Sequence, residues 1–238
     1  MTMPVTLAYR IYQGMWIGLD WIYPPYCAGC GVRNTRWCPA CQQKSLQINP
    51  PWCQKCGLSL RVEGLCKSCR EAPPSFTALR SWASFEGPVR AAIHSLKYRR
   101  DVALGETLAR HLIDALFKSN WCIDLVVPVP LGVARQAQRG YNQAALLAKP
   151  VALALGLRYR PQALAKRRET RSQVGLTLVE RFVNVTGAFQ ANPSIVSGKN
   201  VLVIDDVATS GATLDSCSLA LLEGGAERVF ALTLARAI

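Results

Sequence analysis

The stretch that decides the fold is Val201-Leu-Val-Ile-Asp-Asp-Val-Ala-Thr-Ser-Gly-Ala-Thr213. Val201 to Ile204 form a short, unbroken and largely β-branched apolar run, which is typical of a strand buried on both faces of a parallel sheet. Asp205 and Asp206 follow at its carboxyl end, before a loop of small and hydroxylated residues and the start of a helical pattern. Backbone N–H groups at such a helix start favour a bound phosphate. The pattern therefore predicts a phosphate on the loop and a diol on the two acids, as in a sugar phosphate.

Other phosphate-binding motifs do not occur in this chain. A P-loop would place Gly-Lys-Ser/Thr after a strand and a dinucleotide fold would place GxGxxG there, and the sequence has neither. The alternative is a buried strand with a capped helix and two solvated acids, but a cap uses one acceptor and needs no second acid. As exposed groups at a strand end, both acids are expected to be replaceable with little loss of fold.

The stretch resembles the motif that binds phosphoribosyl pyrophosphate in type I phosphoribosyltransferases. That resemblance implies that Asp205 and Asp206 hold the ribose 2′- and 3′-hydroxyls, while residues 209 to 213 wrap the 5′-phosphate. The expected binding residues of this loop are Val207, Ala208, Thr209, Ser210, Gly211, Ala212 and Thr213.

Length and composition indicate a globular protein with one core and a small appendage. The chain has 238 residues, half of them hydrophobic, and it has no run of about 18 uninterrupted apolar residues, so a transmembrane segment is not expected. Residues 9–26 are apolar and aromatic, but Gln13 and Asp20 interrupt them and no cleavage site follows, unlike a signal peptide. We expect a short helix within residues 1–26 that packs on the body through Ile11, Met15, Trp16 and Leu19, with membrane contact as the alternative.

Eight of the ten cysteines form four CxxC pairs, each able to chelate one tetrahedral ion through a tight turn. Disulfides are the alternative, but without a secretion signal we expect a reducing, cytoplasmic compartment. The pairs predict about two structural Zn²⁺ ions in Cys₄ sites, joined either sequentially or as an interleaved cross-brace. Cys122 and Cys217 lack partners at ligand spacing and are expected to be buried hydrophobes. The expected zinc ligands are Cys27, Cys30, Cys38, Cys41, Cys53, Cys56, Cys66 and Cys69.

Beyond Pro73-Pro74 the pattern alternates between helix and strand. Residues 102–117 and 142–155 have helical periodicity, although Pro150 is expected to kink the second helix or end its first half. Residues 124–129, 201–204 and 229–234 are expected to be strands. The sequence therefore predicts an α/β fold with a parallel sheet, organised as residues 1–26 (short helix), 27–72 (double zinc-ribbon module) and 73–238 (α/β domain).

Three basic stretches add candidate phosphate ligands to the acidic loop. One contains Lys97 in Leu96-Lys-Tyr-Arg-Arg100, and another contains Arg139 and Gly140 after the strand at 124–129. The third runs from Lys166 through Arg168 and Arg171 to Asn184, and its polar composition is expected of a mobile lid. Arginine binds phosphate oxygens in bidentate fashion, and glycine lets the backbone approach a ligand. Each stretch alone is also compatible with a solvated basic face.

The formal net charge of +13 points to an anionic partner. Two Zn²⁺ ions held by eight thiolates would reduce it to roughly +9. Single-stranded DNA, a phosphorylated small molecule and general surface basicity all remain compatible with this excess. Three aromatic residues next to basic ones would suit base stacking, namely Trp37, Trp52 and Tyr98 beside Arg36, Lys55 and Arg99. The alternative is that these aromatic side chains pack in a core or an interface.

The order of these motifs along the chain resembles the ComF/GntX family. The motifs are four CxxC pairs, Ser95-Leu-Lys-Tyr98, Pro128-Val-Pro-Leu131, Arg139-Gly-Tyr-Asn-Gln143, Arg168-Glu-Thr170, Glu180-Arg-Phe-Val-Asn184, Gly187-Ala-Phe189 and the Asp205-Asp206 loop. The resemblance implies a zinc-ribbon head on a phosphoribosyltransferase domain, a pyrophosphate loop near residues 128–140 and a hood near 165–184. It also implies a role in DNA uptake or DNA utilisation, alongside other DNA-uptake proteins.

Two functions of different classes follow from these motifs. In the first, the chain is a transferase that uses phosphoribosyl pyrophosphate, or a related ribose phosphate, with Mg²⁺ and with Asp205, Asp206 and Arg139 at the reacting centre. In the second, it is a non-catalytic adaptor that binds single-stranded DNA through the zinc module and the basic loops. No residue identifies an acceptor base, and phosphoribosyltransferase folds also serve as regulators.

Overall fold

The computed structural model describes residues 5–170 and 177–237. Its centre is a five-stranded sheet in which every recorded pairing is parallel. In spatial order the strands are β1 (Ala78–Ser84), β7 (Arg228–Arg236), β6 (Asn200–Ala208), β2 (Leu125–Pro128) and β3 (Arg158–Tyr159). The predicted α/β fold with a parallel sheet is confirmed.

A switch in strand order lies between β2 and β6. From β2 the chain moves outward to β3, and it then returns to lay β6 on the other side of β2, with β7 beyond it. Ligands of open α/β sheets bind beyond the carboxyl ends of strands at such a switch. The carboxyl ends of β2 and β6 are therefore the first place to look for a site.

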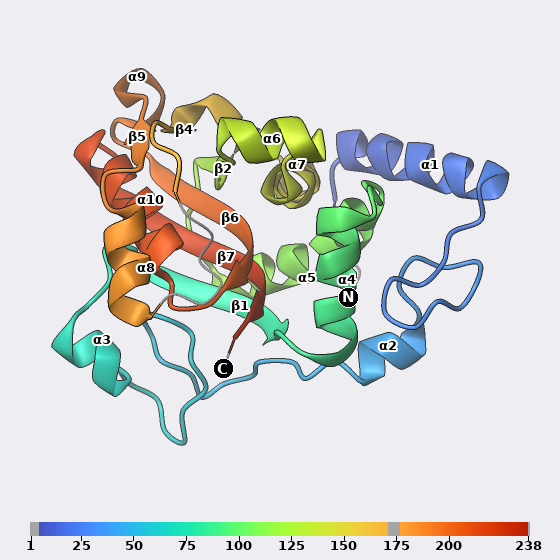
Figure 1. The fold of residues 1–238 in the computed structure, drawn as a ribbon, viewed down its shortest axis with the longest axis horizontal. Helices are drawn as coiled ribbons and strands as arrows, with labels where there is room; N and C mark the ends of the chain where they lie inside the picture. The colour runs from blue at the N-terminus through green and yellow to red at the C-terminus, as the bar shows by residue number, and fades with distance from the viewer. Residues whose placement is uncertain (1–4, 171–176, 238) are drawn as a thin grey trace.

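Both faces of the sheet are covered by helices, so neighbouring strand residues alternate between two cores. On one face Leu125, Val203 and Val229 pack in the core that contains residues of α10 (Ala212–Glu223). On the other, Val126, Leu202 and Phe230 pack with α4 (Gly87–Tyr98), α5 (Leu104–Ser119) and α7 (Gln143–Leu155). Figure 1 shows α10 on one side of the sheet and α4, α5 and α7 on the other. Burial on both faces explains the continuous apolar runs of these strands.

The predicted hood is built beside α10 from a two-stranded hairpin and short helices. Strand β4 (Leu164–Lys166) pairs antiparallel with β5 (Phe189–Ala191), and α8 (Leu178–Val185) lies between them in sequence. The 3₁₀ helix Pro161–Ala163 precedes β4, and α9 (Pro193–Val196) follows β5. Arg171 and Gln173 of the predicted hood lie outside the described residues.

The cysteine-rich segment covers the free edge of β1. It contains the short helices α2 (Pro39–Gln43) and α3 (Lys67–Glu71). Backbone hydrogen bonds of 2.7–2.9 Å join it to the strand, from Ser84 N to Leu46 O, from Ile48 N to Trp82 O and from Leu79 N to Lys55 O. An open sheet edge invites association, so the segment closes the sheet as well as holding cysteines.

Two local details differ from the sequence predictions. Of the two outcomes expected at Pro150, a kink or the end of a helix, the second does not occur, because α7 continues through Pro150 to Leu155. Proline costs about 3 kcal/mol in a helix interior, but α7 is buried against α5, β2 and β6, and this packing keeps the helix intact. Strand β6 is also longer than predicted, because it runs to Ala208 with Asp205 and Asp206 inside it, and Asp205, Val207 and Ala208 continue its pairing with β7.

The N-terminal helix α1 (Leu7–Ile22) forms as expected but faces the other way. It packs on α7, and its buried residue is Tyr9. Of the four residues predicted to pack on the body, Ile11, Met15 and Leu19 are exposed, and Trp16 is partly buried. In the described part of the chain, no helix is both long enough and apolar enough to cross a bilayer.

Candidate functional site

The acidic pair lies at the carboxyl edge of the sheet, next to the last turn of α4. The Lys97 ammonium forms an ion pair with the Asp206 carboxylate. Asp206 is 3% exposed, whereas Asp205 is partly buried and its Oδ1 accepts the Asp206 N–H at 2.8 Å. The prediction that both acids are exposed is therefore wrong, because Lys97 and Gln143 contact Asp206 in the interior and Asp205 is itself partly buried.

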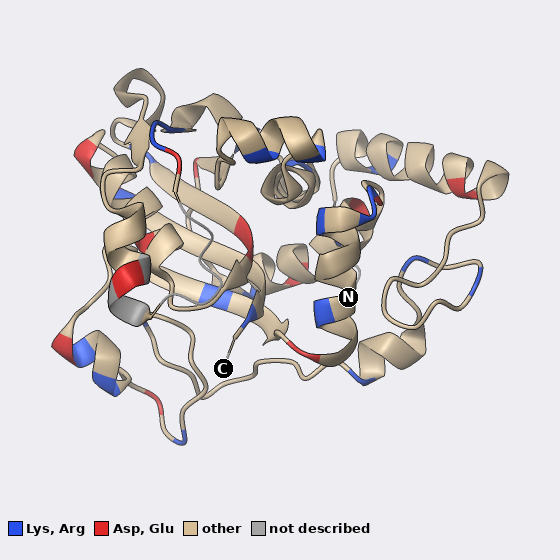
Figure 2. Cartoon of the chain, viewed as in Figure 1, with Lys and Arg blue, Asp and Glu red and all other residues tan. Residues whose placement is uncertain are grey.

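A polar chain leads from Asp206 to the surface. Gln143, the first residue of α7, donates from Nε2 to Asp206 Oδ1 at 3.3 Å. Arg139 donates in turn to Gln143 Oε1, and its guanidinium lies 5.4 Å from the centre of the Tyr98 ring. The structure thus brings together Lys97, Arg139 and Asp206, which come from three separate sequence motifs. Figure 2 shows basic segments of α4 and α6 (Val133–Arg139) on the same side of the sheet as the acidic end of β6.

The loop between α6 and α7 is held in place by its own side chains. Asn142 caps α7 by accepting from the Ala144 and Ala145 N–H groups, and its Nδ2 donates to Val129 O at 2.9 Å. Tyr141 donates to Leu96 O at 2.6 Å, which ties the loop to the last turn of α4. Gly140 ends α6 with φ of +81°, a conformation that a side chain disfavours. Arg139 therefore projects from an anchored segment.

The loop after β6 leads directly into the start of a helix. Gly211 has φ of +84° and directly precedes α10, whose first residue is Ala212. Ser210 Oγ accepts the Ala212 N–H at 3.3 Å, and Thr209 and Ser210 are partly exposed. Free backbone N–H groups at a helix start bind anions. The predicted loop residues therefore lie together, beside the acidic pair.

Electrostatics separate the two acids. Burial and then repulsion by Asp206 raise the pKa of Asp205 well above its ordinary value. Burial acts in the same direction on Asp206, but Lys97 and the hydrogen bond from Gln143 outweigh it and lower the pKa of Asp206. Asp206 is therefore the charged member that pairs with Lys97, and Asp205 is the member that holds a proton more readily.

The hood reaches the expected pyrophosphate loop through Glu169 instead of Arg168. The Arg168 guanidinium donates to Asn184 O and Thr186 O at the end of α8, at 3.0 and 2.9 Å. The Glu169 carboxylate accepts the Ala134 N–H at 3.3 Å and fills the space that a Cβ on Gly132 would need. A carboxylate thus occupies a backbone donor at the start of α6.

The eight cysteines form two clusters, each with four thiols within 4.8 Å of one another. Cys27 Sγ lies 3.6 Å from Cys41 Sγ, and Cys30 Sγ lies 3.6 Å from Cys38 Sγ. A disulfide needs about 2.05 Å, whereas two sulfurs of a tetrahedral site with Zn–S bonds of about 2.3 Å lie about 3.8 Å apart. The donors fit Zn²⁺ and the pairing is sequential, with Cys53, Cys56, Cys66 and Cys69 in the second cluster.

The second cluster shares a core with the sheet domain. Its four cysteines belong to the same buried set as Phe76, Leu79 and the strand residues on that face. The buried Arg236 of β7 donates to Cys56 O at 2.7 Å. A Cβ on Gly57 would lie 2.5 Å from Leu79 O, so this turn requires glycine for its close contact with β1 as well as for its φ of +70°.

The first cluster stands apart with Trp37 as its apolar neighbour. Arg36, just before it, forms ion pairs with Asp20 at the end of α1 and with Asp101 before α5. Trp37 packs edge to face on Trp82, with ring centres 6.2 Å apart, and donates to Gln42 Oε1. Arg36 and Trp37, two of the six side chains suggested for base stacking next to charge, therefore have internal partners, and the centre of the Trp52 ring lies 4.9 Å from the Arg80 guanidinium. Tyr98 remains 67% exposed.

Sequence reasoning did not assign a role to Gln143 or Glu169. Gln143 belongs to the motif Arg139–Gln143. Its position at the first turn of α7, beside the end of a strand, is the feature of the sequence that could have indicated a role in the site. Nothing in the sequence around Glu169 points to contact with Gly132, because the two residues belong to segments that meet only in the folded chain. Cys217 is buried as expected, whereas Cys122 is exposed, so its expected burial is wrong.

Comparisons with known proteins agree with this architecture. Residues 18–70 match the model of the double zinc ribbon domain, and residues 103–238 match that of the phosphoribosyl transferase domain. The chain is 31% identical to DNA utilization protein YhgH of Salmonella typhimurium, over 78% of this chain and 84% of that protein. It is 30% identical to Competence protein F of Haemophilus influenzae, over 89% of this chain and 96% of that protein.

Among solved structures, the chain is similar to glutamine phosphoribosylpyrophosphate amidotransferase from B. subtilis. The TM-score is 0.37 at 25% identity, covering 59% of this chain and 26% of that one. An adenine phosphoribosyltransferase gives a TM-score of 0.35 at 20% identity, covering 54% of this chain and 71% of that one.

Proposed function

We propose, because this chain belongs to the phosphoribosyltransferase family and joins that domain to a double zinc ribbon, that it binds phosphoribosyl pyrophosphate with Mg²⁺ in the cytoplasm. The observation that carries the proposal is the meeting of two acids, a phosphate-type loop and an anchored arginine at the switch point between β2 and β6. In the proposal the protein acts in DNA uptake or utilisation, which is supported by relatives named for DNA utilization and for competence.

Each part of the ligand has a matching part of the site. The ribose hydroxyls would bind Asp205 and Asp206, and the 5′-phosphate would bind the backbone N–H groups and hydroxyls of residues 209–213. Arg139 and Lys97 would bind the pyrophosphate, which carries most of the ligand's charge. Lys97 would then exchange part of its contact with Asp206 for contact with phosphate oxygens, because its side chain is 22% exposed.

The acids also fit Mg²⁺, which prefers oxygen ligands and keeps several waters. Asp205 and Asp206 offer carboxylate oxygens beside the place proposed for the pyrophosphate. When bound, the metal would supply positive charge to the leaving pyrophosphate. The chain's own contribution is to hold the ribose and the 5′-phosphate in a fixed relation to Arg139 and Lys97.

Transfer, if an acceptor binds, would form a bond between its nitrogen and ribose C1 while the bond from C1 to the pyrophosphate oxygen breaks. The electron pair of the broken bond would leave with pyrophosphate, stabilised by Arg139 and Lys97. No described residue stands out as a general base for the acceptor, so the proposal requires binding and does not require turnover.

A second candidate function is that of an adaptor for single-stranded DNA. Exposed Tyr98 precedes Arg99 in the chain and the centre of its ring lies 5.4 Å from the Arg139 guanidinium, an arrangement that suits a base stacked next to charge. This surface adjoins the proposed pyrophosphate position, so the two anionic ligands would compete in this proposal.

Calorimetric titration of the full chain with phosphoribosyl pyrophosphate and Mg²⁺ tests the first function. We expect saturable binding by the native protein and weaker binding by Arg139→Ala, with Arg158→Ala as the matched control because Arg158 lies on β3, at the start of the strand. Repeating the titration with nucleobases and with an oligonucleotide separates transfer from the adaptor function. Absence of heat with phosphoribosyl pyrophosphate would contradict the proposal.

A further inference from the structure

Helix α1 turns its polar side to the protein and its apolar side to solvent. Tyr9 donates to Glu106 Oε1 at 2.9 Å, Gln13 donates to the same atom at 3.4 Å, and Asp20 pairs with Arg36. The usual surface helix does the opposite, with an apolar stripe toward the core. The inward side of α1 thus combines specific polar contacts with the buried ring of Tyr9 and the partly buried rings of Tyr12 and Trp16.

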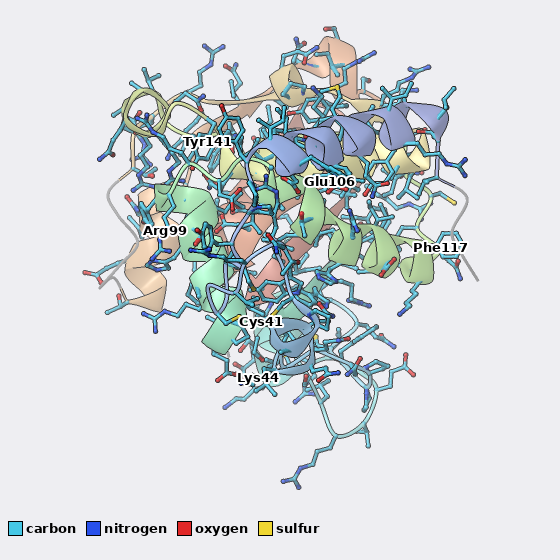
Figure 3. The ribbon with its side chains drawn as sticks, turned by 90° about the vertical axis from the view of Figure 1, so that its right-hand side faces the viewer. Cys41, Lys44, Arg99, Glu106, Phe117 and Tyr141 are labelled. Atoms are coloured by element: carbon cyan, nitrogen blue, oxygen red, sulfur yellow. The ribbon has the colours of Figure 1, made fainter. Side chains whose placement is uncertain are left out.

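The outward side is largely apolar, interrupted by the exposed Arg10. Trp21 is 86% exposed, Ile22 68% and Ile11 59%. The apolar face consists of the exposed apolar side chains of α1 and of the segment just after it, Leu7, Ile11, Met15, Ile17, Leu19, Trp21, Ile22, Tyr23 and Tyr26. Figure 3 shows α1 lying lengthwise over the side that faces the viewer, above Glu106, with no other element in front of it. Within the described residues, nothing covers this face.

The orientation of α1 cannot be reversed cheaply. Glu106 is only 3% exposed and accepts from Tyr9, Gln13 and Arg110. Turning the helix over would remove Tyr9 and Gln13 from the Glu106 carboxylate, and of the three donors only Arg110 would stay. A buried charge that loses hydrogen bonds is costly. Thr6 fixes the start of the helix as well, because it caps α1 and donates to Leu153 O. The exposed apolar face is therefore a stable feature of the fold.

Positive charge surrounds the helix. Arg10 lies on α1, the Lys149 ammonium is 5.7 Å from the centre of the Tyr12 ring, and the Arg33 guanidinium is 5.7 Å from that of Tyr26. None of the three has a carboxylate within 4.0 Å among the described residues. Of the carboxylates beside the helix, Glu106 is paired with Arg110, and Asp20 and Asp101 share Arg36, which leaves one negative charge against these three cations. The net field beside the apolar face is therefore positive.

We propose that the apolar face binds the surface of an anionic lipid bilayer, with α1 lying along it. Apolar and aromatic side chains flanked by Lys and Arg are what an interfacial helix presents to headgroups and acyl chains. Trp21, Tyr23 and Tyr26 supply the amphipathic rings that favour this boundary. At 16 residues the helix is shorter than the about 20 residues of a spanning helix, which suits an orientation along the surface.

A second copy of the chain is the rival occupant. Gly14 and Gly18 are spaced as in helix pairs that pack closely, and a Cβ on either would meet nothing within 4 Å. Helix α1 is about 24 Å long and about 10 Å wide, which gives a footprint of about 240 Å², whereas stable interfaces bury about 800 Å² per partner. Two copies would also bring positive charge together. The bilayer is therefore the better match.

Co-sedimentation of the full chain with vesicles tests the proposal. We expect binding to vesicles of phosphatidylglycerol mixed with phosphatidylcholine and weaker binding to phosphatidylcholine alone. The variant Ile11→Gln/Met15→Gln/Trp21→Gln should bind the mixed vesicles at least about tenfold more weakly, since each side chain loses its burial in the interface. Arg10→Gln should weaken binding about fivefold, the effect of one cation near an anionic surface.

The matched control is Val62→Gln/Leu219→Gln, which removes two exposed apolar side chains outside α1 and should bind like the native chain. Circular dichroism and zinc content establish that each variant is folded. Equal binding by the α1 variant and the native chain would overturn the proposal. So would a native dimer in sedimentation velocity that the α1 variant abolishes, in the absence of vesicle binding.

Discussion

The Lys97 ammonium and the Asp206 carboxylate join the last turn of α4 to β6 at the carboxyl edge of the sheet. The pair is mostly buried, and Gln143 binds the same carboxylate from α7. One acid of the proposed ribose site therefore also holds together three elements of the fold, which couples binding of the ligand to the stability of the domain.

Replacing Asp206 should destabilise the protein. In Asp206→Asn the Lys97 ammonium loses its counter-charge, and we expect the free energy of unfolding in urea to fall by about 2–3 kcal/mol, less than the about 3–5 kcal/mol of a fully buried pair. The variant Lys97→Met/Asp206→Asn should recover most of this loss while binding of phosphoribosyl pyrophosphate stays weak. An Asp206→Asn protein as stable as the native chain would contradict the ion pair.

Replacing Asp205 should make the protein more stable relative to the native chain as the pH rises, whereas replacing Asp206 should make it less stable. Its pKa is raised in the folded protein by burial and by Asp206, so its contribution is present below the unfolded pKa of about 3.9 and is lost as the pH rises through the folded pKa. Asparagine has no proton to lose. The stability of Asp205→Asn relative to the native chain should therefore increase as the pH rises above about 4, measured by urea unfolding in a pH series. A difference independent of pH would contradict this assignment.

The two zinc clusters should differ in their effect on the whole chain. Cys27→Ser and Cys53→Ser change the first cysteine of each cluster, and each should lower the zinc content from about two ions to about one. Cys53→Ser should lower the melting temperature of the sheet domain more, because its cluster shares a core with β1 and β7. Metal analysis and thermal unfolding measure both effects.

Equal destabilisation by the two cysteine variants would show that the shared core contributes little. Because the second cluster is part of the core beneath β1, removing its metal should loosen both the cysteine-rich segment and the sheet. We therefore expect chelators to destabilise the α/β domain together with residues 27–69.

Removing the charge of Glu169 should strengthen binding of phosphoribosyl pyrophosphate. Its carboxylate occupies the Ala134 N–H in the expected pyrophosphate loop, where it competes with and repels a phosphate. Glu169→Gln should lower the dissociation constant about three- to tenfold, a change on the order of one hydrogen bond. Glu227→Gln is the control, since Glu227 pairs with Arg228 at the start of β7. Weaker binding by Glu169→Gln would mean that the carboxylate belongs to the binding-competent state.

Binding of single-stranded DNA, if present, should depend on the surface around Tyr98. Arg99→Ala should make the log–log dependence on salt shallower by about 0.7 for each interaction with a phosphate that the substitution removes, for every sequence tested. Tyr98→Ala should weaken binding with little change in that slope, because stacking is not electrostatic. Arg158→Ala serves as the control. No binding at about 50 mM salt would remove the physical basis of the adaptor function.

The sequence by itself determined the features that depend on neighbouring residues. The apolar run at Val201–Ile204, the loop at 209–213 and the four CxxC pairs each carry their meaning within a dozen residues, because strand patterning, helix starts and metal turns are local. They were enough to predict the parallel α/β fold, the two cysteine clusters and the place of the acidic pair at one edge of the sheet.

Only the tertiary structure decided which partners these residues meet. The burial of Asp206 against Lys97, the sequential joining of the cysteine pairs, and the core shared by Cys53 and Leu79 all depend on segments far apart in the chain. Helix α1 is the plainest case, because its apolar residues predict inward packing, but the buried carboxylate of Glu106 requires polar partners. A buried charge is costly to leave without hydrogen bonds, and the contacts of Tyr9 and Gln13 with Glu106 fix which way the helix faces.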